Sequence, residues 1–439
     1  MVRRALSAAL ALAVFASTTL AQKCSKDSKC PKDTPCCSLY GECGVGAFCM
    51  GGCDPLMSHS FDSCVPAPVC KSANYKFDDL NDIQSIDTYF GDASKVNWQS
   101  QGMPEKYDGS VLLTMAEGTV GTLLSSTHYV WYGKICAKMT TSQGKGVVTA
   151  FILMSDVKDE IDFEWIGVDV EHAQSNYYSQ GVTNYKHGEN LTASNTVKDA
   201  HEYCLDWTED ELTWSIDGNE ARKLARDTTW NATANRFDYP QTPARIMLSL
   251  WPAGLATNEK GTIEWAGGEI DWHSKYMQNG YYYAEVKEVT VECYDAPPMA
   301  KKNGNKSYKY TDDAATNNTV EISNDVVVLG SLMGTGEEPG EASKSSDGPA
   351  PTKSVAMVPG GNPGGGNRQE TAVPNSPAQQ TGAGEGGPFA ADPTAGGGGG
   401  SGQEFQQNVN GGSSIQPHLN NIGGSAFAIV IAVLGLLVL

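Results

Sequence analysis

One segment of the chain, residues 159–167, alternates acidic and apolar side chains. In a β-strand, successive side chains point to opposite faces. The apolar residues of this segment would therefore share one face, which belongs in a core, and three carboxylates would line up on the other. Carboxylates in a row repel each other, so folding alone does not ask for this arrangement. The carboxylates are those of Glu160, Asp162 and Glu164, and the apolar residues are Ile161, Phe163 and Trp165.

A pair of carboxyl groups is what cleavage of a glycosidic bond with retention requires. One carboxylate attacks the sugar carbon, and the other protonates the leaving oxygen and then activates the acceptor, with the two groups about 5–5.5 Å apart. On a flat strand Glu160 and Glu164 are about 13 Å apart at Cα, so their side chains would have to lean together on a curved strand. Asp162 can share a proton with the nucleophile, and crowding raises at least one pKa, as a general acid requires. A solvated acidic strand and a calcium site are the alternatives.

The region around this segment, from about residue 71 to 296, consists of short alternating runs separated by Gly, Asn and Asp. It has no long segment with the 3.6-residue period of a helix, and Asp217-Gly218 is a hairpin signal. We expect one all-β domain over residues 67–296, a sandwich or jelly roll.

The two ends of the chain carry processing signals. Residues 1–21 have a basic start, an apolar run and a small-x-small cleavage site, which predicts a signal peptide. Residues 297–425 are largely Gly, Ser, Pro and Asn, which predicts a disordered stalk. Residues 426–439 are apolar and follow a polar spacer, the pattern of a glycosylphosphatidylinositol (GPI) anchor more than of a transmembrane helix. The candidate attachment residues are Asn410, Gly411 and Gly412.

The net charge of −20 disfavours nucleic acid as a partner, because phosphate binding needs clustered Lys and Arg. We expect the protein at the cell wall and on the outer face of the plasma membrane, held by the GPI anchor. No obligate protein partner is evident. Four sequons permit surface glycans, at Asn190, Asn231, Asn305 and Asn317.

The 12 cysteines, an even number in an exported chain, predict disulfides. Nine of them lie between Cys24 and Cys70, so residues 22–66 should form a small module stabilised by bridges. Zinc is the rival interpretation, but paired CxxC sets are missing. For the rest of the chain we predict two further pairs, Cys70–Cys293 and Cys136–Cys204.

The run from Cys36 to Gly44, followed by Phe48-Cys49, resembles the hevein-like chitin-binding module. That resemblance implies that Ser38, Tyr40 and Phe48 grip N-acetylglucosamine, whereas Glu42 stands where a further aromatic residue is usual. Sugar faces stack on rings, so one ring fewer weakens the grip. A degenerate module that only spaces or stabilises the enzyme is the alternative. The implied bridges are Cys24–Cys37, Cys30–Cys43, Cys36–Cys49 and Cys53–Cys64.

The acidic segment, Asp159 to Glu164, resembles the catalytic motif of the sixteenth glycoside hydrolase family. The run from Gln174 to Tyr178 that follows is similar to the fungal Crh-type chitin–glucan transglycosylases. The resemblance implies a concave, concanavalin-like β-jelly roll with an unbulged catalytic strand. Retaining glycoside chemistry needs no cofactor, and the sequence does not indicate a metal. It also implies Glu160 as nucleophile, Glu164 as acid/base and Asp162 as the assisting group. For sugar subsites we predict Trp251, Trp265, Asn176 and Tyr178, with core packing as the alternative for the tryptophans.

Three functions are consistent with these residues. The first is a transglycosylase that cuts chitin and passes the new reducing end to β-1,3/β-1,6-glucan or to another chitin chain. The second is an endo-hydrolase of chitin or β-glucan that uses the same carboxyl groups. The third is a polysaccharide-binding protein whose acidic strand holds a metal, against which the complete set of three carboxylates argues.

Overall fold

The computed structural model describes residues 22–182 and 184–340. The predicted signal peptide, the apolar tail and the attachment residues Asn410, Gly411 and Gly412 lie outside the described residues. Within the described ranges, no helix has both the length and the apolar character that a membrane span needs.

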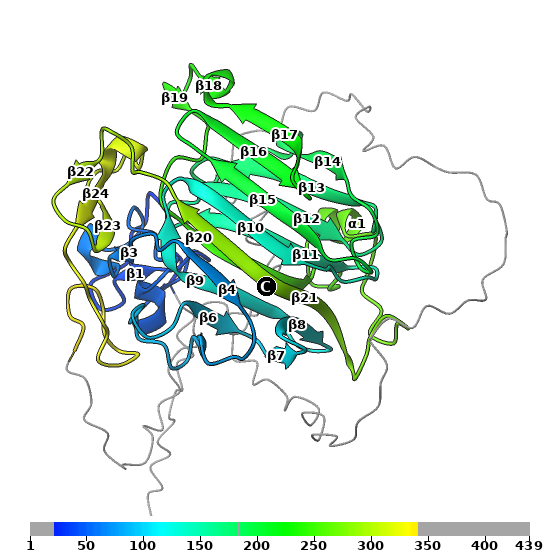
Figure 1. The fold of residues 1–439 in the computed structure, drawn as a ribbon. Helices are drawn as coiled ribbons and strands as arrows, with labels where there is room; N and C mark the ends of the chain where they lie inside the picture. Colours follow the sequence, from blue (N-terminus) through cyan, green and yellow to red (C-terminus); the bar gives the residue numbers. More distant parts are fainter. Residues whose placement is uncertain (1–21, 183, 341–439) are drawn as a thin grey trace, which may run out of the picture.

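Two large sheets form the body of the molecule, which confirms the predicted all-β sandwich (Figure 1). The first sheet, in spatial order, is β14 (Glu189–Thr192), β13 (His172–Tyr178), β12 (Glu160–Ile166), β11 (Val147–Ser155), β20 (Ala244–Pro252), β9 (Thr122–Val130), β6 (Trp98–Gln101) and β5 (Ile83–Ser85). The second is β17 (Asn219–Ala225), β16 (Glu211–Ile216), β15 (His201–Trp207), β10 (Gly133–Met139), β21 (Tyr281–Cys293), β8 (Ser110–Ala116) and β7 (Pro104–Tyr107), with β4 (Ala73–Lys76) also paired to β21.

The remaining elements are short and lie at the ends and edges of the sandwich. They are β1 (Cys36–Cys37), β2 (Cys43–Gly44), β3 (Ala67–Pro68), β18 (Trp230–Asn231), β19 (Arg236–Phe237), β22 (Lys301–Lys302), β23 (Ser307–Tyr310) and β24 (Val320–Ser323), with the helix α1 (Lys260–Trp265) and the 3-10 turns η1 (Gly46–Cys49), η2 (Phe61–Ser63), η3 (Tyr185–His187), η4 (Arg226–Thr229) and η5 (Asn317–Thr319).

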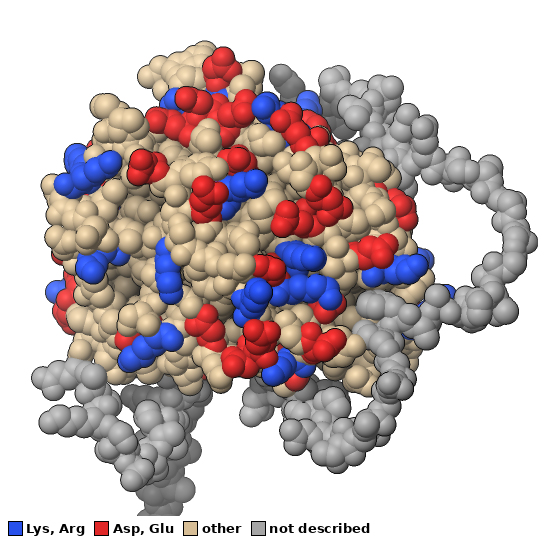
Figure 2. Space-filling view, viewed as in Figure 1, with Lys and Arg blue, Asp and Glu red and all other residues tan. Residues whose placement is uncertain are grey.

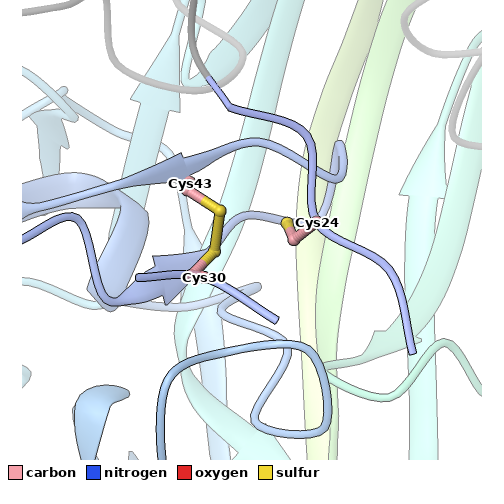
Figure 3. A group of neighbouring side chains, drawn as sticks. All are labelled: Cys24, Cys30 and Cys43. Atoms are coloured by element: carbon pink, nitrogen blue, oxygen red, sulfur yellow. A yellow bond between two sulfur atoms is a disulfide. The ribbon is translucent and has the colours of Figure 1, made fainter. Parts of the chain in front are cut away.

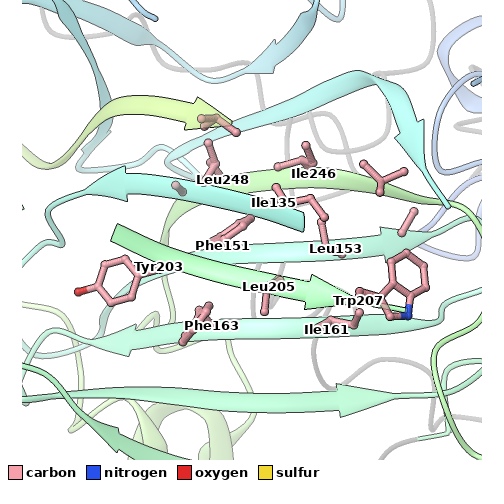
Figure 4. Packing of buried hydrophobic residues seen from close by; sticks show 14 of the residues in the cluster. Ile135, Phe151, Leu153, Ile161, Phe163, Tyr203, Leu205, Trp207, Ile246 and Leu248 are labelled. Atoms are coloured by element: carbon pink, nitrogen blue, oxygen red, sulfur yellow. The ribbon is translucent and has the colours of Figure 1, made fainter. Parts of the chain in front are cut away.

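The main core fills the space between the two sheets, and strand β12 contributes its apolar face to it (Figure 4). Phe163 stacks between Phe151, at 6.3 Å between ring centroids, and Trp165, at 5.8 Å. Ile161 belongs to the same cluster. The predicted alternation of β12 is therefore confirmed, and its second face is free for the carboxylates.

All six predicted disulfides are present: Cys24–Cys37, Cys30–Cys43, Cys36–Cys49, Cys53–Cys64, Cys70–Cys293 and Cys136–Cys204. Among the described residues, two cysteine groups have the spacing of a metal site. In the first, Figure 3 shows Cys30 bonded to Cys43 with Cys24 beside them. Cys24 is itself bonded to Cys37. In the second, Cys136 and Cys204 form a bridge next to Glu202. Bridged sulfurs have no thiolate to offer, so neither group is a zinc site.

The predicted start of the disordered stalk at residue 297 is wrong for residues 297–340. This segment forms a small sheet in the order β22-β24-β23-β3, which joins it to the linker after the disulfide-rich module. Tyr308, Tyr310 and Val320 are buried in the main core, and Tyr308 packs edge-on against Trp131. The strands are too short for their alternation to stand out in a Gly- and Asn-rich sequence.

Acidic and basic side chains are interspersed on the face shown in Figure 2. That face presents no continuous basic stripe of the kind that follows a nucleic acid backbone. The sequons differ in exposure: Asn190 and Asn305 are exposed, Asn231 is half-buried, and Asn317 is buried.

Candidate active site

Strand β12 lies near one edge of the first sheet, between β11 and β13, and its pairing shows no register shift on either side. The strand is therefore unbulged, as the sequence resemblance implied. Its acidic side chains point away from the core and are buried all the same. Glu160 is 4% exposed, Asp162 is 0% exposed and Glu164 is 7% exposed.

The strands on the two sides of the carboxylates differ in chemistry. On β11, the residues paired with them are apolar, whereas on β13 they are polar. A sugar ring has apolar faces and hydroxyl groups at its edge, so this surface offers partners for both. The pairs are Glu160 with Met154 and Tyr178, Asp162 with Ile152 and Asn176, and Glu164 with Ala150 and Gln174.

Burial is the main cause that raises the pKa of all three carboxyl groups. Glu160 and Asp162 also act on each other: Glu160 raises the pKa of Asp162, while the neighbouring carboxyl group of Asp162 partly offsets the rise for Glu160. For Glu164, the charge of Asp162 adds to the rise. The set therefore holds protons to a higher pH than free carboxyl groups do.

Several oxygens of this set lack a protein partner with hydrogen-bond geometry among the described residues. They are Oε1 of Glu160, both carboxyl oxygens of Asp162 and Oε1 of Glu164. Buried polar atoms are nearly always satisfied, and exceptions mark places where a ligand or water completes the set. The strand thus presents acceptors and donors to something outside the fold.

The two predicted subsite tryptophans lie together at the Glu164 end of the strand. Trp251 belongs to an apolar cluster on the carboxylate face of the first sheet, not to the main core, and Trp265 packs against it at 6.1 Å between ring centroids. The indole Nε1 of Trp265 donates a hydrogen bond of 2.8 Å to Gln174, the β13 residue paired with Glu164. Trp251 is 1% exposed, so Trp265, which is half-buried, is the more accessible of the two rings.

The other two predicted subsite residues lie directly beside the carboxylates. Nδ2 of Asn176 donates a hydrogen bond of 2.6 Å to the hydroxyl of Tyr178. Burial and then the charges of Asp162, Glu160 and Glu164 raise the pKa of Tyr178. Its hydroxyl therefore stays protonated and faces the site.

The module residues predicted to grip chitin are not on a free surface. Ser38 is 2% exposed and Phe48 is 4% exposed, and Phe48 packs against the bridged cysteines. Tyr40 is half-buried and packs against the apolar cluster that contains Trp251. These three side chains thus face the module interior or the jelly roll.

Comparison with known proteins identifies the family. Residues 90–267 match the model of glycosyl hydrolases family 16. Crh-like protein 3 of Botryotinia fuckeliana is 55% identical over 327 residues, which cover 74% of each chain. Crh-like protein 2 of Aspergillus fumigatus is 50% identical over 374 residues, 82% of this chain and 84% of that one. Among solved structures, the chain is similar to Crh5 transglycosylase in complex with NAG, with 30% identity, a TM-score of 0.49, and coverage of 60% of this chain and 97% of that one.

The chain belongs to the Crh-like proteins of glycosyl hydrolase family 16. It is therefore a glycosidase-type enzyme of the fungal cell wall, and strand β12 lies within the matched residues.

Two supporting residues of this Crh-like protein were not predicted from the sequence. The buried carboxylate of Asp159 accepts hydrogen bonds from the backbone N–H groups of Gln180, Gln241 and Thr242, so it fixes the loops at the Glu160 end. Its place as the first residue of the motif was the available signal.

The second is Arg222 on β17, whose charge lowers the pKa of Asp162 and so limits the rise caused by burial. Its guanidinium donates hydrogen bonds to the backbone oxygens of Ser175 and His187 and packs over the ring of Trp214 at 4.6 Å. Nothing in the local sequence links Arg222 to β12, because the two belong to different sheets.

Proposed function

We propose that this enzyme cuts chitin with retention and transfers the new reducing end to β-1,3/β-1,6-glucan or to chitin, and so cross-links the wall. The observation that carries the proposal is the row of buried carboxyl groups on β12, several of whose oxygens have no described protein partner. The Crh-like identity of its relatives supports the same reaction class.

In the first step, the carboxylate of Glu160 attacks the anomeric carbon. The bond to the leaving oxygen breaks, and Glu164 gives that oxygen its proton. Burial raises the pKa of Glu164, which suits a proton donor, and Asp162 lies between the two glutamates on the same face of β12, where it can share a proton with Glu160. The product is a glycosyl ester on Glu160 and a free chain end.

In the second step, Glu164 takes a proton from a hydroxyl group of the acceptor sugar, whose oxygen attacks the same anomeric carbon. The ester bond breaks, and Glu160 returns to its carboxylate form. Two inversions give net retention. Ala150, Ile152 and Met154 supply an apolar surface beside the carboxylates for the sugar face.

Export and anchoring form part of the proposal. Residues 1–21 would direct secretion, and residues 426–439 would be replaced by a GPI anchor at Asn410, Gly411 or Gly412. All 12 cysteines of the chain are paired, as expected for an exported protein. The enzyme would then act from the outer face of the plasma membrane on chitin and β-glucan in the wall.

The test uses the secreted chain without residues 341–439, a chito-oligosaccharide donor and a fluorescent laminari-oligosaccharide acceptor. Glu160→Gln is the matched control, since it removes the nucleophile and keeps the shape. Labelled hybrid products that are absent with the control support the transglycosylase. Short unlabelled fragments alone would show an endo-hydrolase, and no conversion by either protein would overturn enzymatic function.

A further inference from the structure

The disulfide-rich module, residues 22–66, is fixed to the jelly roll and does not stand apart from it. The backbone N–H of Gly52 donates hydrogen bonds to Oδ1 of Asp156 at 2.9 Å and to the hydroxyl of Tyr129 at 3.2 Å. Next to them, Lys158 and Asp54 form a buried ion pair at 3.9 Å. Buried polar contacts of this kind hold one orientation, since separating the parts would leave these groups unpaired.

The C-terminal part of the described chain holds the module from another side. Gly46 donates a backbone hydrogen bond to Gly334, and Gly336 donates one to Ser63. Leu329 lies in an apolar cluster that also contains module residues. In Figure 1 the blue module and the yellow segment lie together at one end of the sandwich.

The module packs onto the same sheet face that carries the catalytic carboxylates. Cross-strand pairing continues each carboxylate row from β12 through β11 and β20 to β9 and, for two of the rows, to β6. The rows end in residues that touch the module. These sheet residues are Gln101, Leu123, Ser125, Arg245 and Met247. Together with the module residues Ser38, Leu39, Tyr40 and Phe48 they line a small cavity.

The contact is close. A Cβ added at Gly51 would lie 2.5 Å from the guanidinium of Arg245, whose Nε and Nη2 are already held by Ser126 and Gln99. The hydroxyl of Tyr40 has a hydrogen bond to Gln101, and Leu39 packs against the apolar cluster of this face. The face that the hevein resemblance assigned to chitin is therefore used for docking.

The polysaccharide must cross β12 and not run along it. Glu160 and Glu164 flank the scissile bond, and the line between them follows the strand. The sugar chain therefore passes over neighbouring strands, on one side toward β11, β20 and β9. Strands lie about 4.8 Å apart, so β20 and β9 are about 10 and 14 Å from β12. A chain running in this direction meets the module at that distance.

We infer that the disulfide-rich module forms the end wall of the polysaccharide groove, and that Leu39 on its surface contacts the last sugar on that side. The module would thus set how many sugar units bind between the carboxylates and the wall. This inference rests on the proposed function for the identity of the sugar chain.

The experiment measures affinity against chain length by calorimetry, with the secreted Glu160→Gln protein, residues 22–340, and chito-oligosaccharides of two to eight units. Affinity should rise with length and then level off when the wall is reached. Adding Leu39→Ala should weaken binding of the longest chains about fivefold to tenfold and leave the short chains unchanged. Lys32→Ala, an exposed change on the same module, should alter neither.

Gly51→Ala is a second variant, because its added Cβ would displace the module from Arg245 of the jelly roll. The change itself lies outside the groove. It should also weaken only the long chains. A loss that is equal at all lengths, or no loss with either variant, would overturn the inference. Binding of laminari-oligosaccharides in place of chito-oligosaccharides would refute the proposed donor, and the same length comparison would then be made with that series. If neither series binds, both proposals fail.

Discussion

The indole Nε1 of Trp265 donates a hydrogen bond of 2.8 Å to Oε1 of Gln174, and Gln174 stands opposite Glu164 on the neighbouring strand. Helix α1 ends at Trp265, so this bond ties the helix to the acid/base end of the catalytic strand. The geometry links a residue of a surface helix to the orientation of β13 beside the reacting groups.

Trp265→Phe should therefore lower kcat/KM about tenfold. The ring remains for stacking, but the hydrogen bond is lost and Gln174 is left without this partner, at about 1–1.5 kcal/mol. Steady-state transfer kinetics measure the effect. Trp230→Phe is the control, since Trp230 is 50% exposed and lies on the hairpin of β18 and β19, not on α1. An unchanged rate for Trp265→Phe would show that the bond does not support the site.

The roles of the two glutamates predict opposite stereochemistry when azide replaces the missing group. With Glu160→Ala, azide can attack the sugar directly in a single displacement, so the product should be the α-glycosyl azide. With Glu164→Ala, azide attacks the ester on Glu160 and should give the β-product. Each variant without azide should lose about 10²–10⁴-fold or more in kcat. NMR of the products identifies the anomer, and exchanged outcomes would reverse the two roles.

Burial and Asp162 raise the pKa of Glu164, and this has a consequence for stability. A carboxyl group with a raised pKa in the folded state contributes its stability below its unfolded pKa, about 4.3, and loses it as pH rises toward the folded value. Glu164→Gln cannot ionise. Its Tm should match that of the unchanged protein near pH 4 and exceed it by about 1–2 °C at pH 7 for about 1 kcal/mol.

Scanning calorimetry from pH 4 to 8 measures this difference. The exposed pair of Lys223 and Glu211 offers a control, because Glu211→Gln removes a surface carboxyl and should change Tm little at any pH. A Tm difference for Glu164→Gln that shrinks as pH rises would contradict the assignment of a raised pKa.

The catalytic strand was predictable because alternation along a strand decides which side chains share a face. Ile161, Phe163 and Trp165 are in the core, and the carboxylates are on the other face. Alternation does not say what packs onto that second face. The docking of the module depends on a backbone N–H of Gly52 and on Arg245, which belong to no sequence pattern.

Sequence patterns do not show which distant segments pack together. For this reason the two supporting residues were missed and the start of the stalk was placed too early. Arg222 acts on Asp162 from a strand of the other sheet, and only the three-dimensional packing brings them together. Tyr308 and Tyr310 reach the core from a segment whose average composition resembles a linker. Composition averages over a window, whereas burial depends on single side chains.

The burial of each sequon asparagine predicts whether it carries a glycan. Nδ2 of Asn317, the atom that would carry a glycan, donates a hydrogen bond of 3.0 Å to Glu209, and the residue is buried. Asn190 and Asn305 are exposed. We expect glycans at Asn190 and Asn305 but not at Asn317. Glycosidase treatment in heavy-oxygen water followed by peptide mass spectrometry reads each site, and occupancy at Asn317 would mean that this segment packs differently in the secreted protein.

The bridge Cys70–Cys293 joins the linker before β4 to the last residue of β21, 223 positions later. Such a long loop has much conformational freedom in the unfolded chain, so a cross-link there should stabilise more than a short one. Replacing both cysteines by Ser should lower the free energy of unfolding by about 2–5 kcal/mol.

Denaturant unfolding of the secreted chain measures this loss. The matched comparison is the double replacement of Cys136 and Cys204, whose bridge closes a loop of 68 residues. For loops of 223 and 68 residues the predicted difference is about 1 kcal/mol, so the variant without Cys70–Cys293 should lose the more stability of the two. A negligible loss for Cys70–Cys293 alone would show that the pairing of β4 with β21 already fixes that end of the sandwich.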